Sequence, residues 1–165
     1  MLVIGIDPGT ARTGYGVVEQ GRDGSLAAVE YGVIETSAKL PQAKRLLEIS
    51  DQLSQILTLH RPESAAVEKL FVREHVNTAL SVGQASGVAM LTLAEAQLEV
   101  REYAPLAVKQ AICGYGGADK TQMQEMVKTL LRLEARPQPD DAADALAVAI
   151  CHIHTESTHQ KLSKA

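Results

Sequence analysis

Cysteines and long apolar runs are scarce in this sequence. Its 165 residues include two cysteines, Cys113 and Cys151, and neither belongs to a paired-cysteine motif. A disulfide framework and a thiolate zinc site are therefore both unexpected, and this usage suits a reducing cytosol. No run approaches the ~20 apolar residues of a membrane-spanning helix, and the N-terminus opens without a basic segment or cleavage site. We expect a cytoplasmic protein with no membrane association.

An excess of positive charge is also missing. Lys and Arg total 16 against 20 Asp and Glu, which gives a formal net charge of −4 and a pI near 5.7. Any binding to nucleic acid must therefore depend on a local basic face or on bound cations. The chain is 45% hydrophobic and 22% charged, a composition and length typical of one globular domain.

The order of the predicted elements indicates one α/β domain. Three extended segments separated by Gly and Pro turn signals predict an antiparallel meander. A change of hydrophobic period after Pro41 then predicts a helix that ends at His60. The predicted strands span 2–7, 13–19, 26–36, 64–68 and 98–103, and the further helices span 76–96, 105–112, 119–133 and 142–154. We expect a five-stranded mixed sheet in a single domain over 1–154, followed by a mobile polar tail over 155–165.

Two acidic residues stand at the ends of apolar strands. Asp7 ends the first predicted strand, and Glu68 ends the fourth. A carboxylate in such a place is costly unless something satisfies it. A turn in which Asp7 caps the following Pro8-Gly9 is one explanation. If the first and fourth strands are neighbours, however, the two acids converge at one edge of the sheet.

Two more acids begin the last predicted helix. Asp141 and Asp144 are three residues apart and therefore share a helix face. Acids in a first turn are stabilised by the helix dipole, by ~0.3–1 kcal/mol each, so Asp140 and Asp141 could also be simple caps. Asp144 lies one turn further in, and its small neighbours suggest close packing against the sheet.

Four acids in one site would repel one another unless divalent cations neutralised them. Carboxylate oxygens without His or Cys favour Mg²⁺ or Mn²⁺. Two such ions about 4 Å apart can hold the attacking water and the leaving oxygen of a phosphodiester displacement. The spacing therefore predicts metal-assisted phosphoryl chemistry.

Further motifs accompany these acids in a fixed order. They are residues 5–10 with 13–16, Val67-Glu68 with Phe71, 83–85 with 87–89, 108–110, Lys120, and 141–147. Over nearly its whole length the chain resembles the RuvC family of bacterial Holliday junction resolvases. The resemblance implies a ribonuclease H-like fold and a homodimeric endonuclease that nicks two opposing strands of a four-way junction, in homologous recombination and DNA repair. It implies two Mg²⁺ ions, replaceable by Mn²⁺, on Asp7, Glu68, Asp141 and Asp144, and partnership with the RuvA–RuvB branch-migration complex.

The resemblance also assigns DNA contacts. Phe71, the only phenylalanine, would stack on an unpaired base, an interaction of ~1–3 kcal/mol. Lys109 and Lys120 would contact phosphates, and the weaker candidates are Arg73, Lys128 and Arg132. Phe71 could instead be a core residue, and each of the basic residues could be a solvated surface charge. Family members often carry more positive charge in the loop that here holds Glu74. The small residues of helix 76–96 would admit a second subunit, or would pack on the chain's own sheet.

Other functions share parts of this pattern. Residues 7–10 resemble the phosphate loop of sugar kinases and actin-like ATPases, but those proteins close two such domains around a nucleotide and 165 residues hold one. A nuclease of the same fold that acts on another nucleic acid remains open. The P-loop-like stretch 114–121 has Asp119 where a glycine is needed, which excludes it. His152, His154 and His159 lack a fourth metal ligand, so we expect a solvated helix end there.

Overall fold

The computed structural model describes residues 1–70 and 76–163. Phe71 and Arg73 lie outside this part of the chain. The described residues form five strands, β1 (Leu2–Asp7), β2 (Arg12–Gln20), β3 (Leu26–Glu35), β4 (Ser64–Glu68) and β5 (Glu99–Tyr103). They form five helices, α1 (Gln42–His60), α2 (Val76–Glu95), α3 (Pro105–Cys113), α4 (Lys120–Leu130) and α5 (Asp140–Leu162). None of these helices is both long and apolar enough to cross a membrane.

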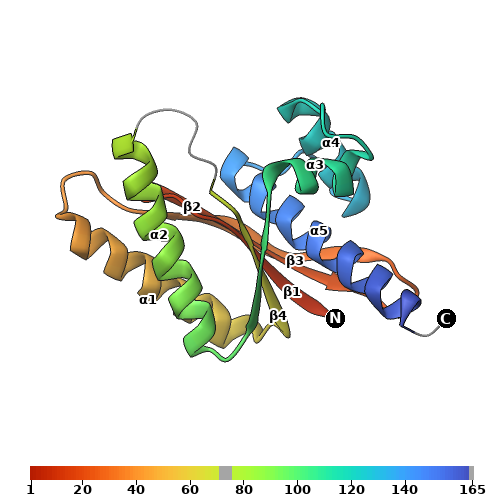
Figure 1. The fold of residues 1–165 in the computed structure, drawn as a ribbon, viewed down its shortest axis with the longest axis horizontal. Coiled ribbons are helices and arrows are strands. Elements are labelled where there is room, and N and C mark those ends of the chain that lie inside the picture. Colours follow the sequence, from red (N-terminus) through yellow and green to blue (C-terminus); the bar gives the residue numbers. More distant parts are fainter. Residues whose placement is uncertain (71–75, 164–165) are drawn as a thin grey trace.

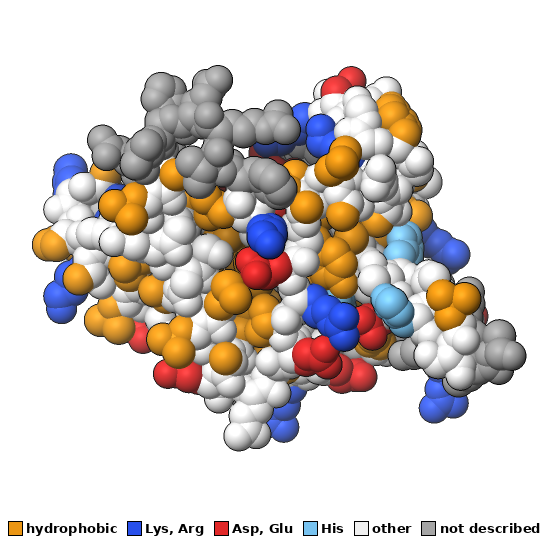
Figure 2. Space-filling model, in the orientation of Figure 1, with side chains coloured by type: hydrophobic (Ala, Val, Ile, Leu, Met, Phe, Trp, Pro, Cys, Tyr) orange, Lys and Arg blue, Asp and Glu red, His pale blue; other side chains and the backbone are white. Residues whose placement is uncertain are grey.

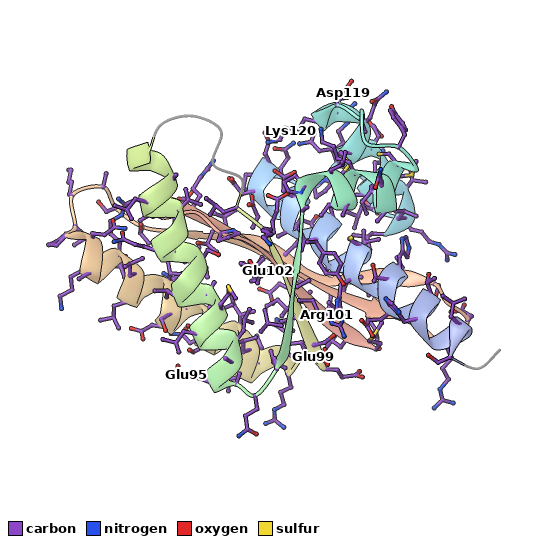
Figure 3. All side chains as sticks on the ribbon, in the orientation of Figure 1. Glu95, Glu99, Arg101, Glu102, Asp119 and Lys120 are labelled. Carbon is purple, nitrogen blue, oxygen red and sulfur yellow. The ribbon has the colours of Figure 1, made fainter. Side chains whose placement is uncertain are left out.

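The strands form one mixed sheet in the order β3-β2-β1-β4-β5. The pairs β1–β2 and β2–β3 are antiparallel, whereas β4 runs parallel to both β1 and β5. The predicted meander and five-stranded mixed sheet are confirmed, and the first and fourth strands are neighbours, which is the condition for Asp7 and Glu68 to converge. The edge strand β5 carries the charged side chains of Glu99, Arg101 and Glu102 (Figure 3), which discourage pairing with another sheet edge.

Helices cover both faces of this sheet (Figure 1). Helices α1 and α2 pack on one face, and α3, α4 and α5 pack on the other. Because successive side chains of a strand point to opposite faces, β1 divides its residues between the two layers. Ile4 and Ile6 are buried with α1 and α2, while Val3 is buried with α5.

Helix α5 lies unusually close to β1 and β2 because glycines face it. A Cβ on Gly5 would overlap the backbone carbonyl of Ala145, and one on Gly14 would overlap the carbonyl of Asp141. A Cβ on Gly16 would lie 2.9 Å from the backbone nitrogen of Leu146. A larger residue at any of these positions would push α5 off the sheet. The glycines therefore fix the height of the helix that carries Asp141 and Asp144.

Two expectations for the C-terminal region need correction. Helix α5 runs to Leu162, although the sequence pattern predicted its end near His154. His152 is 2% exposed and its ring nitrogens lie 2.8 Å from Tyr103 Oη and 3.0 Å from Ser64 Oγ, so the predicted solvated helix end is wrong for this residue. Its partners lie 49 and 88 residues away, which no local pattern could reveal. The mobility of 155–165 stays a prediction.

Candidate active site

Asp7 and Glu68 reach the same edge of the sheet from neighbouring parallel strands. The last registered pair of β1 and β4 is Ile6 with Val67, and the two acids follow it directly. Each acid is an even number of residues from a side chain buried under α5, Val3 in β1 and Ala66 in β4. Both carboxylates therefore belong to the face that α5 covers.

Helix α5 brings the other two acids to this edge. Asp7 pairs across the sheet with Gly14, and the backbone of Asp141 lies directly on Gly14. Asp144 follows one turn later on the same helix face. The charges of Glu68, Asp144 and Asp141 all act on Asp7. The structure thus brings all four predicted acids into one cluster, which we call the acid cluster.

The acid cluster holds more negative charge than its surroundings compensate. Burial, followed by repulsion from Glu68, Asp144 and Asp141, raises the pKa of Asp7 to about 8. Burial also raises the pKa of Glu68, with repulsion from Asp144 as the second cause. The pKa of Asp144 is raised by burial, against the opposing effect of Lys120. Such a site favours either protonation or a bound cation.

The donors of the acid cluster suit a divalent cation in chemistry and charge. All four are carboxylates, the ligand type that Mg²⁺ and Mn²⁺ prefer. Within the described chain, however, no three His, Cys, Asp or Glu side chains are already arranged around one ion position. The acid cluster therefore has suitable ligands, but their side chains are not yet arranged around a single ion position.

Lys120 begins α4 (Figure 3) and borders the acid cluster at Asp144. A capping box between Asp119 and Gln122 fixes this helix start. The Lys120 ammonium lies 3.1 Å from Asp140 Oδ2 and 3.5 Å from Asp144 Oδ2. Burial disfavours the ammonium charge, but these two contacts outweigh it and raise the pKa of Lys120.

Asp140 differs from the clustered acids because its charge is satisfied. Its Oδ1 accepts a hydrogen bond of 2.8 Å from the buried Gln124, and Lys120 holds the other oxygen. These contacts lower the pKa of Asp140, with the Lys120 hydrogen bond as the largest cause. Asp140 is thus a partner of the lysine, a role that no local sequence pattern indicates because Gln124 and Lys120 belong to another helix.

Lys109 and Lys120 line a cavity of about 240 Å³ together with Glu68 and Asp144. The Lys109 ammonium donates a hydrogen bond of 2.8 Å to the carbonyl of Ala118, which anchors it at the wall. Two of the predicted phosphate contacts therefore lie beside the acid cluster. The weaker candidates Lys128 and Arg132 do not line this cavity.

Sequence reasoning missed one cation beside the acids. Arg12 Nη1 lies 3.6 Å from Asp141 Oδ2, and another nitrogen of its guanidinium lies 3.0 Å from Glu35 Oε1. The position of Arg12, five residues after Asp7 and at the beginning of β2, is the only sequence signal that could have suggested it.

The fold and the acid cluster together define an α/β protein of the ribonuclease H-like class with a polycarboxylate site. The family model for crossover junction endodeoxyribonuclease RuvC matches residues 3–152. The chain belongs to the RuvC family.

Relatives and solved structures agree with this membership. The RuvC of Roseiflexus sp. is 61% identical over 151 residues, which cover 92% of this chain and 89% of the relative. The RuvC of Chloroflexus aurantiacus is 55% identical over 161 residues, 98% of each chain. The Thermus thermophilus RuvC structure is 35% identical with a TM-score of 0.90, and covers 96% of this chain and 97% of its own. The same RuvC in complex with a Holliday junction substrate gives 33% identity, a TM-score of 0.88 and 96% coverage of each chain.

Proposed function

We propose that this chain cuts four-way DNA junctions by hydrolysing phosphodiester bonds at the acid cluster, in homologous recombination and DNA repair. One observation carries the proposal: four carboxylates, whose mutual repulsion adds to burial in raising the pKa of Asp7, meet beside two lysines at the edge where β1 and β4 end. Membership in a family named for crossover junction endonucleases, and the likeness to a RuvC bound to a Holliday junction, supply the substrate class. Neither supports the kinase or actin-like alternative.

The acid cluster would hold two divalent cations, Mg²⁺ by preference and Mn²⁺ as a substitute. Asp7, Glu68, Asp141 and Asp144 are the proposed ligands and the proposed catalytic residues. When bound, the ions would activate water and stabilise the charge that develops on the phosphate and the leaving oxygen. Loss of the proton that the raised pKa of Asp7 retains must precede full ligation.

The lysines would hold the DNA strand in place. Lys109 and Lys120 can each donate to non-bridging phosphate oxygens at the cavity beside Glu68 and Asp144. Lys120 would exchange its contact with Asp144 for a phosphate while Asp140 keeps it at the wall. Phe71 and Arg73 lie outside the described residues, and their predicted roles in base stacking and phosphate contact stay predictions.

We place a homodimer interface on α2. Ala85 and Ala89 bury one side of this helix against the chain's own sheet. On the other side Leu80 and Leu91 are 64% and 59% exposed, and hydrophobic side chains gather over this part of the molecule (Figure 2). A two-fold dimer through this face would present two identical acid clusters, as paired symmetric nicks require.

The proposal also includes cooperation with the RuvA–RuvB branch-migration complex and action in the cytoplasm.

The test is cleavage of a synthetic mobile four-way junction, beside linear duplex and RNA–DNA hybrid of matching sequence. Each substrate is incubated with Mg²⁺, Mn²⁺ or EDTA. We expect paired symmetric nicks, confined to the junction and dependent on metal. Equal cutting of hybrid or duplex would assign the acid cluster to another nucleic acid, and no cutting with either metal would refute the proposed reaction.

A further inference from the structure

A second hollow opens on the other side of the acid cluster. It is a groove of about 570 Å³ beside Asp141, and its walls include Thr10, Arg12, Arg45 and Ser81. We call it the arginine groove. The cavity of Lys109 and Lys120 adjoins α3 and α4, whereas the arginine groove adjoins α1 and α2, which cover the opposite face of the sheet (Figure 1). The acid cluster therefore lies between two hollows that are both lined by cations.

Arg45 brings a charge into the groove that the described chain does not neutralise. Its Nε donates a hydrogen bond of 2.8 Å to Thr36 Oγ1. No carboxylate among the described residues forms an ion pair with it, and no other guanidinium nitrogen of Arg45 has a hydrogen-bond partner there. Four N–H donors of a half-buried cation thus remain for a ligand. A planar guanidinium in this state matches the oxygens of a phosphate.

Arg45 is held in place by a chain of buried hydroxyl groups. Thr36 Oγ1 donates to the carbonyl of Thr10 at 2.6 Å, and Thr10 Oγ1 donates to the carbonyl of Ser81 at 2.7 Å. Thr10 and Thr36 are both buried. These bonds link α1, the loop after β1 and α2 to one another. The cation is therefore oriented before any ligand arrives, which lowers the entropic cost of binding.

Arg12 on one side repeats the arrangement of Lys120 on the other. Lys120 lies 3.5 Å from Asp144 and is held by Asp140 at 3.1 Å. Arg12 lies 3.6 Å from Asp141 and is held by Glu35 at 3.0 Å. Each α5 acid thus has one cation on its own side, and a carboxylate outside the acid cluster retains that cation. Both cations stay at the rim if the acids take up metal ions.

We infer that the arginine groove binds a backbone phosphate of the DNA strand that is cut, on the opposite side of the scissile phosphate from the one held by Lys109 and Lys120. Arg45 supplies the main charge and donors, and Arg12 supplies a second cation beside Asp141. The inference rests on the proposed function, because a strand lying across the acid cluster places phosphates on both sides of it. Free inorganic phosphate has the same chemistry, and the experiment separates the two.

The first measurement is junction affinity in EDTA, which prevents cutting. Arg45→Gln removes the charge and keeps an amide that can still reach Thr36. Lys44→Gln is the matched control, because Lys44 is the exposed neighbour on α1, carries the same charge and does not line the groove. We expect Arg45→Gln to bind about tenfold more weakly and to flatten the slope of log K against log salt concentration by about one. Lys44→Gln should match the unmodified chain in both junction affinity and salt dependence.

The second measurement locates the phosphate. Junctions are prepared in which one backbone phosphate at a time is a neutral methylphosphonate. We expect one position at which neutralising the phosphate weakens junction binding by the unmodified chain but not by Arg45→Gln. At another position, on the opposite side of the cleavage site, neutralising the phosphate should weaken binding by the unmodified chain but not by Lys120→Gln. Coupling of both variants to the same side of the cleavage site would overturn the inference.

Further outcomes keep the inference separate from the proposed function. Arg12→Gln is scanned in the same way if Arg45→Gln has a lowered melting temperature. If the unmodified chain cuts junctions but Arg45→Gln and Lys44→Gln bind junctions equally well, the inference about the arginine groove is refuted and the proposed function is not. A chain that neither binds nor cuts junctions would refute the proposed function first. Stabilisation by inorganic phosphate that Arg45→Gln abolishes, with junction binding unchanged, would assign the groove to a free anion and overturn the DNA inference.

Discussion

Helix α5 carries two clusters of polar groups against the sheet, and they differ in how their polar atoms are satisfied. Near its middle, His152 is held between Tyr103 and Ser64 at 2.8 and 3.0 Å, and burial lowers its pKa so that the neutral ring is favoured. At its beginning, Asp141 and Asp144 meet Asp7 in a cluster whose charges oppose one another.

The difference separates a structural cluster from a functional one. A buried polar network with every partner present contributes to stability and needs nothing from outside. A group of half-buried acids that repel one another more than the neighbouring cations compensate destabilises the fold until a metal ion or a proton arrives. We therefore expect substitutions in the two clusters to have opposite effects on stability and activity.

The largest effect is expected for Asp7→Asn. The amide keeps the size of the side chain but removes a proposed metal ligand, so junction cleavage with Mg²⁺ should fall at least about a thousandfold. Junction binding in EDTA should remain close to that of the unmodified chain. Loss of both binding and folding would instead give Asp7 the structural role that we assign to His152.

The acid cluster should also give the metal-free protein an inverse dependence of stability on pH. The pKa of Asp7 is about 8 in the folded chain and 3.8 in its ordinary state, so the folded state binds more protons between these values. Stability is then lost as pH rises through this window, by at most about 1.4 kcal/mol per pH unit for one group. The lowered pKa of His152 has the opposite effect below pH 6.5, so the range from 6.5 to 8 is decisive.

Thermal unfolding in EDTA across this range tests the expectation. Asp7→Asn should flatten the slope and should be the more stable chain at pH 8. Mg²⁺ should raise the melting temperature of the unmodified chain more at pH 8 than at pH 6.5, because metal ligation requires deprotonated carboxylates. Stability that rises with pH in EDTA would contradict uncompensated charge in the acid cluster.

His152→Ala should reverse this pattern. It removes the hydrogen bonds of the ring nitrogens with Tyr103 and Ser64 and opens a cavity, so the free energy of unfolding should fall by about 2–4 kcal/mol. Cleavage per folded molecule should change little at temperatures where the variant is folded. Denaturant unfolding measures the first effect, and cleavage rates corrected for folded fraction measure the second. A variant of normal stability with lost cleavage would place His152 in the active site.

The sequence was sufficient for the parts of the fold that local patterns determine. The three extended segments separated by Gly and Pro turn signals predicted the antiparallel meander of β1, β2 and β3. The apolar strands ending in Asp7 and Glu68 were recognisable because a carboxylate at such a position needs a reason. The neighbouring positions of β1 and β4, which bring these acids together, could be stated only as a condition.

What escaped prediction depends on partners distant in the sequence. The last two turns of α5 are polar, but their hydroxyl groups bond within the helix, as Thr155 does with the carbonyl of Cys151 at 2.8 Å. Ser157 meets Gln20 from the other end of the chain, at 3.1 Å. Arg45 lines the arginine groove, where Thr36 and Thr10 link α1 to the loop after β1.

The smallest effect, expected for Asp140→Asn, sharpens the comparison within a single turn of α5. Asp140 has its charge satisfied by Lys120 and Gln124, whereas the pKa of Asp144, four residues on, is raised by burial. Asp140 is exposed, so the free energy of unfolding should change little.

Without this carboxylate, Lys120 is held less firmly at the cavity wall, and cleavage should fall about three- to tenfold, an effect of order 1 kcal/mol on the barrier. Glu134→Gln, at another exposed acid outside both hollows, is the matched control. A loss as complete as that of Asp7→Asn would make Asp140 a metal ligand, and rates equal to those of the control would remove it from the positioning of Lys120. A several-fold loss at unchanged stability would show that Asp140, whose charge is already satisfied, affects cleavage through the position of Lys120.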